Sequence, residues 1–142
     1  MKIIFDYNRT LFNPDSGMLF PNVFRVLKVL APKHELFLVT LDKPERKTST
    51  AIEELRPFFN QIFFVERKTA TLFAQIVNGS EQPERAIVIG DRLEDEIAIG
   101  QQLGLVTVHV CQQSRPKFSK ITPTHTVSEI KKVIELIKQY EE

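Results

Sequence analysis

Three aspartates in this sequence are placed where carboxylates can gather around a cation. Asp6 directly follows the apolar run 2–5, and Asp91 follows the apolar run 86–89 after a single glycine. Asp95 comes four residues after Asp91, so both side chains can share one face of the first turn of a helix. Carboxylates that converge raise one another's pKa unless a cation neutralises them. Because oxygen-only ligands suit Mg²⁺ better than zinc, the three aspartates predict a magnesium site.

A hydroxyl and a cation follow two other apolar runs. Thr40 ends the run 36–40, and Lys68 comes shortly after the run 62–65. A phosphoryl group needs hydrogen-bond donors and positive charge around its oxygens, and these two side chains offer both. Taken alone, Thr40 is also acceptable as a structural hydroxyl. Lys68 is acceptable as a solvated loop lysine, and Arg67 competes with it for the same role.

Each aspartate has an ordinary interpretation too when it is taken alone. Asp6 is acceptable as a strand-end or turn residue, Asp91 as a helix N-cap and Asp95 as a charge at a helix start. Glu94 and Glu96, which flank Asp95, are expected to be solvated. The functional interpretation therefore rests on the joint pattern and on the order of its members along the chain.

The elements that must position these residues follow from the hydrophobic pattern. Apolar runs of strand length, without polar alternation, are typical of strands buried on both faces of a parallel sheet. They span 2–5, 36–40, 62–65, 86–89 and 106–110. Helical spacing or helix start and stop signals fill the intervals at 22–30, 44–56, 69–77 and 93–103, and a last helix is expected to open at a capping box, 126–129.

This order of elements predicts an α/β fold. We expect a three-layer sandwich with a Rossmann-like five-stranded parallel sheet and helices on both faces, and a surface loop at 112–123. Ligands of such sheets bind beyond the carboxyl ends of the strands. The pattern places Asp6, Thr40, Lys68 and Asp91 at that edge.

Length and composition narrow the class of protein. The 142 residues, 42% of them hydrophobic and 26% charged, predict one domain spanning 1–142. A net charge of +1 does not indicate the excess of positive charge that is typical of proteins that bind nucleic acid or an anionic membrane. One cysteine, Cys111, excludes an internal disulfide and a multi-cysteine metal site. With no signal peptide pattern and no apolar run long enough for a membrane span, we expect a cytoplasmic protein.

The polar residues at the strand ends resemble the four motifs of the haloacid dehalogenase-like (HAD) superfamily. They occur in the order of that family, with its strand placement, across essentially the whole chain. The matching residues are Asp6-Tyr7-Asn8-Arg9-Thr10-Leu11, Thr40, Lys68 and Gly90-Asp91-Arg92-Leu93-Glu94-Asp95.

The resemblance implies a role for each matching side chain. Asp6 corresponds to the nucleophile that attacks phosphorus and forms an aspartyl-phosphate. Thr40 and Lys68 correspond to the hydroxyl and the cation that hold the transferring phosphoryl group. Asp91 corresponds to an acidic Mg²⁺ ligand, and Asp95 to the carboxylate that supports the metal. The implied activity is Mg²⁺-dependent hydrolysis of phosphate monoesters.

Asn8 departs from the phosphatase pattern. Phosphatase members of the family have a second aspartate there, which protonates the leaving oxygen and then activates water. The backbone carbonyl of Asn8 still corresponds to a metal ligand, but its amide side chain cannot shuttle a proton. General acid–base catalysis contributes ~10²–10⁴ in rate, so an attenuated phosphatase, one that uses another acid, and a non-catalytic descendant all stay open. Arg9 also replaces a residue that is small, often glycine, in that motif.

Nothing in the chain has the length of an inserted cap domain. Only ten residues separate Leu11 from Asn22, which predicts a short flap at about 11–21. An open site favours large phosphorylated substrates or a cap from a partner subunit, and the sequence does not fix the oligomeric state. The flap's apolar side chains are expected to pack on their own domain or to contact such a partner: Phe12, Met18, Leu19 and Phe20.

Two rival functions belong to other classes. The first is a regulatory module that keeps the metal and phosphate site without turnover, which Asn8 favours. The second is a receiver-type phosphoacceptor domain, which is disfavoured because the third strand ends on Val65-Glu66-Arg67 without an aspartate. The histidines lack ligand spacing and receive no role: His34, His109 and His125.

Overall fold

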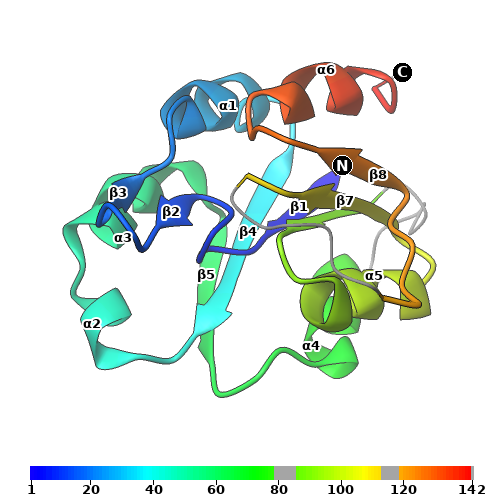
Figure 1. Cartoon of the computed structure of the whole chain (residues 1–142), viewed down its shortest axis with the longest axis horizontal. Coiled ribbons are helices and arrows are strands. Elements are labelled where there is room, and N and C mark those ends of the chain that lie inside the picture. The colour runs from blue at the N-terminus through cyan, green and yellow to red at the C-terminus, as the bar shows by residue number, and fades with distance from the viewer. Residues whose placement is uncertain (79–85, 113–118, 142) are drawn as a thin grey trace.

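The computed structural model describes residues 1–78, 86–112 and 119–141 and contains a six-stranded sheet in the order β5-β4-β1-β6-β7-β8 (Figure 1). All neighbouring strands of this sheet run parallel. The strands are β1 (Lys2–Phe5), β4 (Glu35–Leu41), β5 (Gln61–Val65), β6 (Ile87–Gly90), β7 (Val106–Val110) and β8 (His125–Val127). The predicted α/β class is confirmed.

The central strand, β1, is buried on both faces. Ile3 and Phe5 belong to one hydrophobic cluster and Ile4 to a second one on the opposite face of the sheet. Successive residues of a strand point to opposite faces, so an uninterrupted apolar run is what a strand between two cores requires.

Helices cover both faces of the sheet and create the three layers. They are α1 (Val23–Leu30), α2 (Pro44–Lys47), α3 (Thr50–Leu55), α4 (Ala70–Val77), α5 (Ala98–Gln102) and α6 (Lys132–Lys138). Buried residues of α1, α3 and α6 join the cluster of Ile3, whereas α4 and α5 pack on the cluster of Ile4. Figure 1 shows α1 with α6 on one side of the sheet and α4 with α5 on the other.

Local capping explains where two of these helices begin. The Ser49 hydroxyl accepts a hydrogen bond from the backbone N–H of Ile52 (3.0 Å), and the Thr69 hydroxyl accepts one from Leu72 (3.2 Å). The Ser49 cap starts a new helix, so the helix expected at 44–56 is divided into α2, α3 and a 3₁₀ turn at Arg56–Phe58.

The C-terminal part differs from the prediction in two ways. The sheet has a sixth strand, β8, and the expected capping box at 126–129 is wrong because Thr126 and Val127 pair with β7. β-Branched residues favour this strand, and burial of Val127 stabilises it. The last helix, α6, begins at Lys132. Of the predicted loop 112–123, residues 119–123 contain no helix or strand, and residues 113–118 lie outside the described ranges.

The segment after β1 is a small hairpin of β2 (Phe12–Asn13) and β3 (Met18–Leu19). Phe20 is buried in the core, and the ring of Phe12 stacks on that of Tyr7 with 5.1 Å between centroids. Both contacts agree with the expectation that the flap packs on its own domain, while Met18 is exposed. Across the described ranges, no helix has the length and apolar character needed to cross a membrane.

Candidate active site

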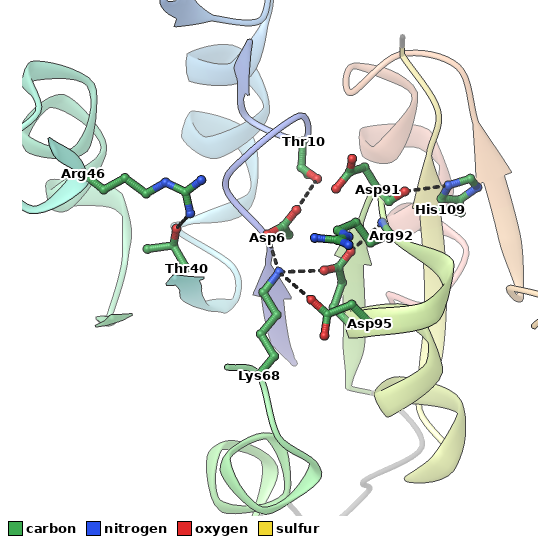
Figure 2. Close-up of polar contacts among 10 residues, drawn as sticks. Asp6, Thr10, Thr40, Arg46, Lys68, Asp91, Arg92, Asp95 and His109 are labelled. Carbon is green, nitrogen blue, oxygen red and sulfur yellow. Dashed lines mark hydrogen bonds and ion pairs between the residues drawn. The ribbon is translucent and has the colours of Figure 1, made fainter. Parts of the chain in front are cut away.

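Asp6 lies at the carboxyl edge of the sheet, where β1 ends between β4 and β6. Its backbone N–H continues the pairing with β6 by donating to the carbonyl of Ile89 (2.9 Å). The side chain is only 5% exposed. One carboxylate oxygen accepts from Lys68 Nζ (2.5 Å) and the other from the Thr10 hydroxyl (3.1 Å), as Figure 2 shows. The carboxylate is therefore held in one orientation by two buried donors.

The loop after Asp6 turns tightly around one carbonyl. The Tyr7 carbonyl accepts hydrogen bonds from the backbone N–H groups of Thr10 (3.3 Å), Leu11 (2.9 Å) and Phe12 (3.0 Å). This turn puts Arg9 at φ 61°, a left-handed conformation that glycine adopts without strain. The backbone thus explains why a small residue suits this position of the motif.

Gln112, two residues after the end of β7, anchors the same loop. Its Nε2 donates to the carbonyl of Thr10 (3.1 Å), and its Oε1 accepts from the backbone N–H of Ile130 (3.3 Å). The sequence pattern does not single out this residue, because a glutamine after a strand gives no signal of its own.

Lys68 is the hub of a buried ionic cluster. Its Nζ lies 2.5 Å from Asp6 Oδ1, 2.6 Å from Glu96 Oε1 and 3.9 Å from Asp95 Oδ2, and its side chain is 4% exposed. Burial alone would lower the pKa of Lys68, but the charges and hydrogen bonds of Asp6 and Glu96 raise it above its ordinary value. The ammonium is therefore charged at neutral pH.

The expectation that Glu96 is solvated is wrong. Its side chain is 1% exposed, with Oε1 bound to Lys68 and Oε2 accepting from the backbone N–H of Arg92 (2.6 Å). Residues Leu93–Ile97 form a π-helical turn, and Asp95 has φ −120° and ψ −107°, outside the helical region. This break in helical phase turns residue 96 toward the cluster, which a regular 3.6-residue period does not predict.

Gly90 makes room for Glu96. A Cβ atom on Gly90 would lie 2.4 Å from Cγ, 2.6 Å from Oε2 and 2.7 Å from Cδ of Glu96. Only glycine avoids these contacts without a shift of the Glu96 side chain. The glycine at position 90 was therefore the sequence signal that another side chain, that of Glu96, packs against the backbone there.

Asp91 is half-buried and carries an unsatisfied oxygen. Its Oδ1 is buried and has no hydrogen-bond partner in the part of the chain that the structure describes. Its backbone carbonyl accepts from His109 Nε2 (3.0 Å), so this histidine, to which we assigned no role, holds the Asp91 backbone. Burial, followed by the charge of Asp6, raises the pKa of Asp91 to about 7 and that of Glu96 to about 8.

These carboxylates fit a divalent cation. Among the described residues, oxygens of Asp6, Asp91 and Glu96 lie within 4.8 Å of one another. Asp6 and Glu96 each have both carboxylate oxygens in hydrogen bonds, whereas Asp91 Oδ1 lacks a partner among the described residues, so Asp91 has the oxygen most suited to an ion such as Mg²⁺. Asp95, 31% exposed, lies outside this group, and Asn8 is half-buried in the adjacent loop.

Thr40 lies on the other side of Asp6. It belongs to the end of β4 and is 1% exposed, and its hydroxyl accepts from Arg46 Nη1 of α2 (3.1 Å). Figure 2 draws this pair on the side of Asp6 away from Asp91. The sequence pattern gives no sign of this role for Arg46, because only the turn after β4 brings α2 back over the strand end.

Several solved structures have a fold similar to that of this chain. The magnesium-bound HAD-hydrolase YfnB from Bacillus subtilis matches 87% of this chain with a TM-score of 0.73 and 22% identity. A HAD phosphatase from Thermococcus onnurineus matches 84% with a TM-score of 0.72 and 14% identity. The L-2-haloacid dehalogenase from Xanthobacter autotrophicus matches 96% of this chain and 98% of its own, with a TM-score of 0.73 and 10% identity. The chain has a HAD-like fold.

These likenesses concern the fold alone, since all three identities are low. The chain spans 58% of the length of the first two proteins. The three comprise a phosphatase, a dehalogenase and a magnesium-bound hydrolase, so the fold alone does not select the reaction. Comparison of the sequence with protein-family models and with curated proteins gives no match.

Proposed function

We propose that this protein is a Mg²⁺-dependent phosphohydrolase of the HAD-like superfamily that acts on phosphate monoesters through an aspartyl-phosphate on Asp6. The observation that carries the proposal is the environment of this carboxylate. Asp6 is buried at the sheet edge, is oriented by Lys68 and Thr10, and lies beside Asp91, whose Oδ1 has no partner within the described ranges. A magnesium-bound hydrolase and a phosphatase among the structural neighbours support it.

Each residue then has a task in phosphoryl transfer. Asp6 attacks phosphorus, and Lys68 and Thr40 bind the oxygens of the transferring group. Asp6, Asp91 and the Asn8 carbonyl would hold Mg²⁺, with Asp95 at the margin. The ion supplies positive charge that neutralises the carboxylates and the phosphoryl oxygens. Glu96, whose oxygens are both engaged, orients Lys68.

Asn8 attenuates the reaction in this proposal. No carboxylic acid at residue 8 protonates the leaving oxygen, and no carboxylate there activates water against the aspartyl-phosphate. The missing acid–base catalysis amounts to ~10²–10⁴ in rate. Substrates whose leaving group departs without a proton are least affected.

The alternative function is a regulatory module that binds metal and phosphate without turnover. Asn8 is the observation that favours it, because an amide keeps the backbone carbonyl and removes the proton shuttle. The complete Lys68 cluster favours the enzyme instead, since a binding module has no need of an oriented nucleophile.

The setting of the site is also part of the proposal. We infer a single domain over residues 1–142 without a cap, because the segment after β1 contains only the short β2–β3 hairpin. An uncovered site suits a large phosphorylated substrate in the cytoplasm. Neither nucleic acid nor a membrane is expected as a partner, given the net charge of +1.

Steady-state hydrolysis of phosphate esters tests the proposal. Activated and unactivated monoesters are supplied with Mg²⁺ to the native chain, to Asn8→Asp and to Asp6→Asn as the blank. We expect the native chain to exceed the blank and Asn8→Asp to be ~10²–10⁴ faster, most of all on the unactivated esters. If native and Asn8→Asp proteins both equal the blank while Mg²⁺ and inorganic phosphate still bind, the regulatory module is correct.

A further inference from the structure

Arg46 is a half-buried cation that has no acidic partner within the ranges 1–78, 86–112 and 119–141. Its guanidinium donates from Nη1 to the Thr40 hydroxyl (3.1 Å), and its Cζ lies 5.8 Å from the centroid of the Tyr7 ring. In the described part of the chain it forms no ion pair, and its other N–H groups have no acceptor. A guanidinium carries five N–H donors, so most of this one's binding capacity is unused.

The neighbouring cations of the same segment behave differently. Lys47 pairs with Asp42 (2.8 Å) and contacts the Phe64 ring, and Lys43 is exposed to solvent. Partial burial of a charge without a counter-ion is unfavourable. The arrangement at Arg46 is therefore that of a site completed by an anionic ligand, and a planar guanidinium binds a carboxylate or phosphate through two parallel hydrogen bonds.

The position of Arg46 places this anion next to the transferring phosphoryl group. Because the Thr40 oxygen accepts from Arg46, the single Thr40 hydroxyl proton is available to a ligand oxygen. An oxyanion on the remaining Arg46 donors would then lie beside the phosphoryl group that Thr40 holds in the proposed function. The simplest occupant is a group bonded directly to that phosphoryl.

Asn8 points to the same kind of leaving group. Without an acid at residue 8, the leaving oxygen must depart as a stable anion. Carboxylate and phosphate oxygens do so, whereas alkoxide oxygens need a proton. Two features of the site therefore suit the cleavage of an anhydride bond. One is the amide at residue 8, and the other is the arginine beside the phosphoryl-binding hydroxyl, which has no ion pair within the described residues.

We propose that the substrate is an acyl phosphate or a phosphoanhydride and that Arg46 binds its leaving oxyanion, an inference that rests on the proposed function. An Asp6 oxygen forms a bond to phosphorus, and the bond between phosphorus and the bridging oxygen breaks. The electron pair leaves on that oxygen, which becomes a carboxylate or phosphate oxyanion on Arg46. No proton moves in this step, so Asn8 does not obstruct it.

Substrate preference of Arg46 variants tests this inference. Acetyl phosphate, inorganic pyrophosphate and p-nitrophenyl phosphate are assayed with Mg²⁺ on the native chain and on Arg46→Gln, Arg46→Lys and Lys43→Gln, with Asp6→Asn as the blank. Acetyl phosphate and pyrophosphate distinguish the two anhydride classes. p-Nitrophenyl phosphate supplies a good leaving group that is not a carboxylate or phosphate.

We expect Arg46→Gln to lower the ratio of kcat/KM on the better anhydride to kcat/KM on p-nitrophenyl phosphate about 10- to 100-fold, the worth of a charge-assisted hydrogen-bond pair. Arg46→Lys should recover part of this ratio, since it keeps the charge without the planar fork. Lys43→Gln removes an exposed charge of the same segment and should change the ratio less than about twofold.

Equal losses on all three substrates would show that Arg46 binds the phosphoryl group itself, which overturns the inference and leaves the proposed function intact. An alkyl phosphate is assayed alongside on the native chain, and a native preference for it over both anhydrides overturns the inference as well. If no substrate is consumed above the Asp6→Asn blank, the proposed function fails and this inference fails with it. Denaturant unfolding of each variant separates these results from loss of fold.

Discussion

The two sides of Asp6 differ in how far the protein itself satisfies their charges. On one side, Lys68 is surrounded by Asp6, Asp95 and Glu96, and the Glu96 carboxylate is further held by a backbone N–H. On the other, Arg46 contacts a hydroxyl and an aromatic face and has no acidic partner among the described residues. The hydrogen bonds of Lys68 fix the geometry of Asp6 without a ligand, although Asp91 Oδ1 on the same side has no partner among the described residues. The remaining donors of Arg46, in contrast, are the ones proposed to bind a ligand. Stability should therefore depend mainly on the first side and substrate choice on the second.

Removal of the Lys68 charge should have the largest effect. Lys68→Met leaves Asp6 and Glu96 buried without their cation, and breaking one partner from a buried pair costs about 3–5 kcal/mol. Denaturant unfolding without metal at pH 8 measures the loss. The matched control, Lys138→Met, removes a lysine from an exposed pair with Glu135 and should cost no more than about 1 kcal/mol.

The loss in Lys68→Met should shrink as the pH falls. The native pKa values of Asp91 and Glu96, about 7 and about 8, lie above those of an unfolded chain, so the native state retains protons that the unfolded state releases. Their contribution to stability is complete below about pH 4 and is lost as the pH rises through 7 and 8. Lys68 opposes both shifts, so its removal raises both pKa values further. A difference from the native chain that is as large at pH 5 as at pH 8 would contradict this account.

Gly90→Ala should have an intermediate effect on the same side. The new Cβ meets Cγ, Cδ and Oε2 of Glu96 at 2.4–2.7 Å, and overpacking of this kind costs about 1–3 kcal/mol. The double variant Gly90→Ala/Glu96→Ala removes the atoms that clash. Its loss in free energy of unfolding should therefore be smaller than the sum of the two single losses, and simple additivity would show that Gly90 does not accommodate Glu96.

The smallest effect on stability is expected on the Arg46 side. Thr40→Val removes one buried hydroxyl that accepts from Arg46, a loss of about 1 kcal/mol. Thr40→Ser keeps the hydroxyl and serves as the control. A loss in Thr40→Val as large as that in Lys68→Met would show that the two sides of Asp6 are equally structural.

Most of the fold could be predicted from the hydrophobic pattern, because each buried parallel strand appears in the sequence as a run of apolar residues. The five predicted runs correspond to β1, β4, β5, β6 and β7. The strand β8 escaped because it is short, and Thr126 also looks like a helix cap. Only the pairing of this segment with β7 decides between a strand and a helix cap, and that pairing joins residues that are distant in the sequence.

The candidate site was predictable where it depends on strand ends and not where it depends on local backbone breaks. Asp6, Lys68 and Asp91 come together because parallel strands end at one edge. Glu96 could not be predicted, because a regular helix was assumed when the carboxylates were assigned to its faces. The irregular backbone at Asp95 turns residue 96 away from the face that a regular helix would give it. Arg46 was missed because α2 is a four-residue helix whose position over Thr40 follows from the turn after β4.

The most direct test of the account is phosphorylation of Asp6 itself. The chain is incubated with acetyl phosphate or p-nitrophenyl phosphate and Mg²⁺, quenched in acid and mapped by mass spectrometry, with Asp6→Asn as the control. Because Asn8 cannot activate water, we predict a single phosphoryl group on Asp6 that needs Mg²⁺ and is absent from Asp6→Asn. A chain that stays unmodified while it releases phosphate, or that is modified equally in Asp6→Asn, would contradict the role assigned to Asp6.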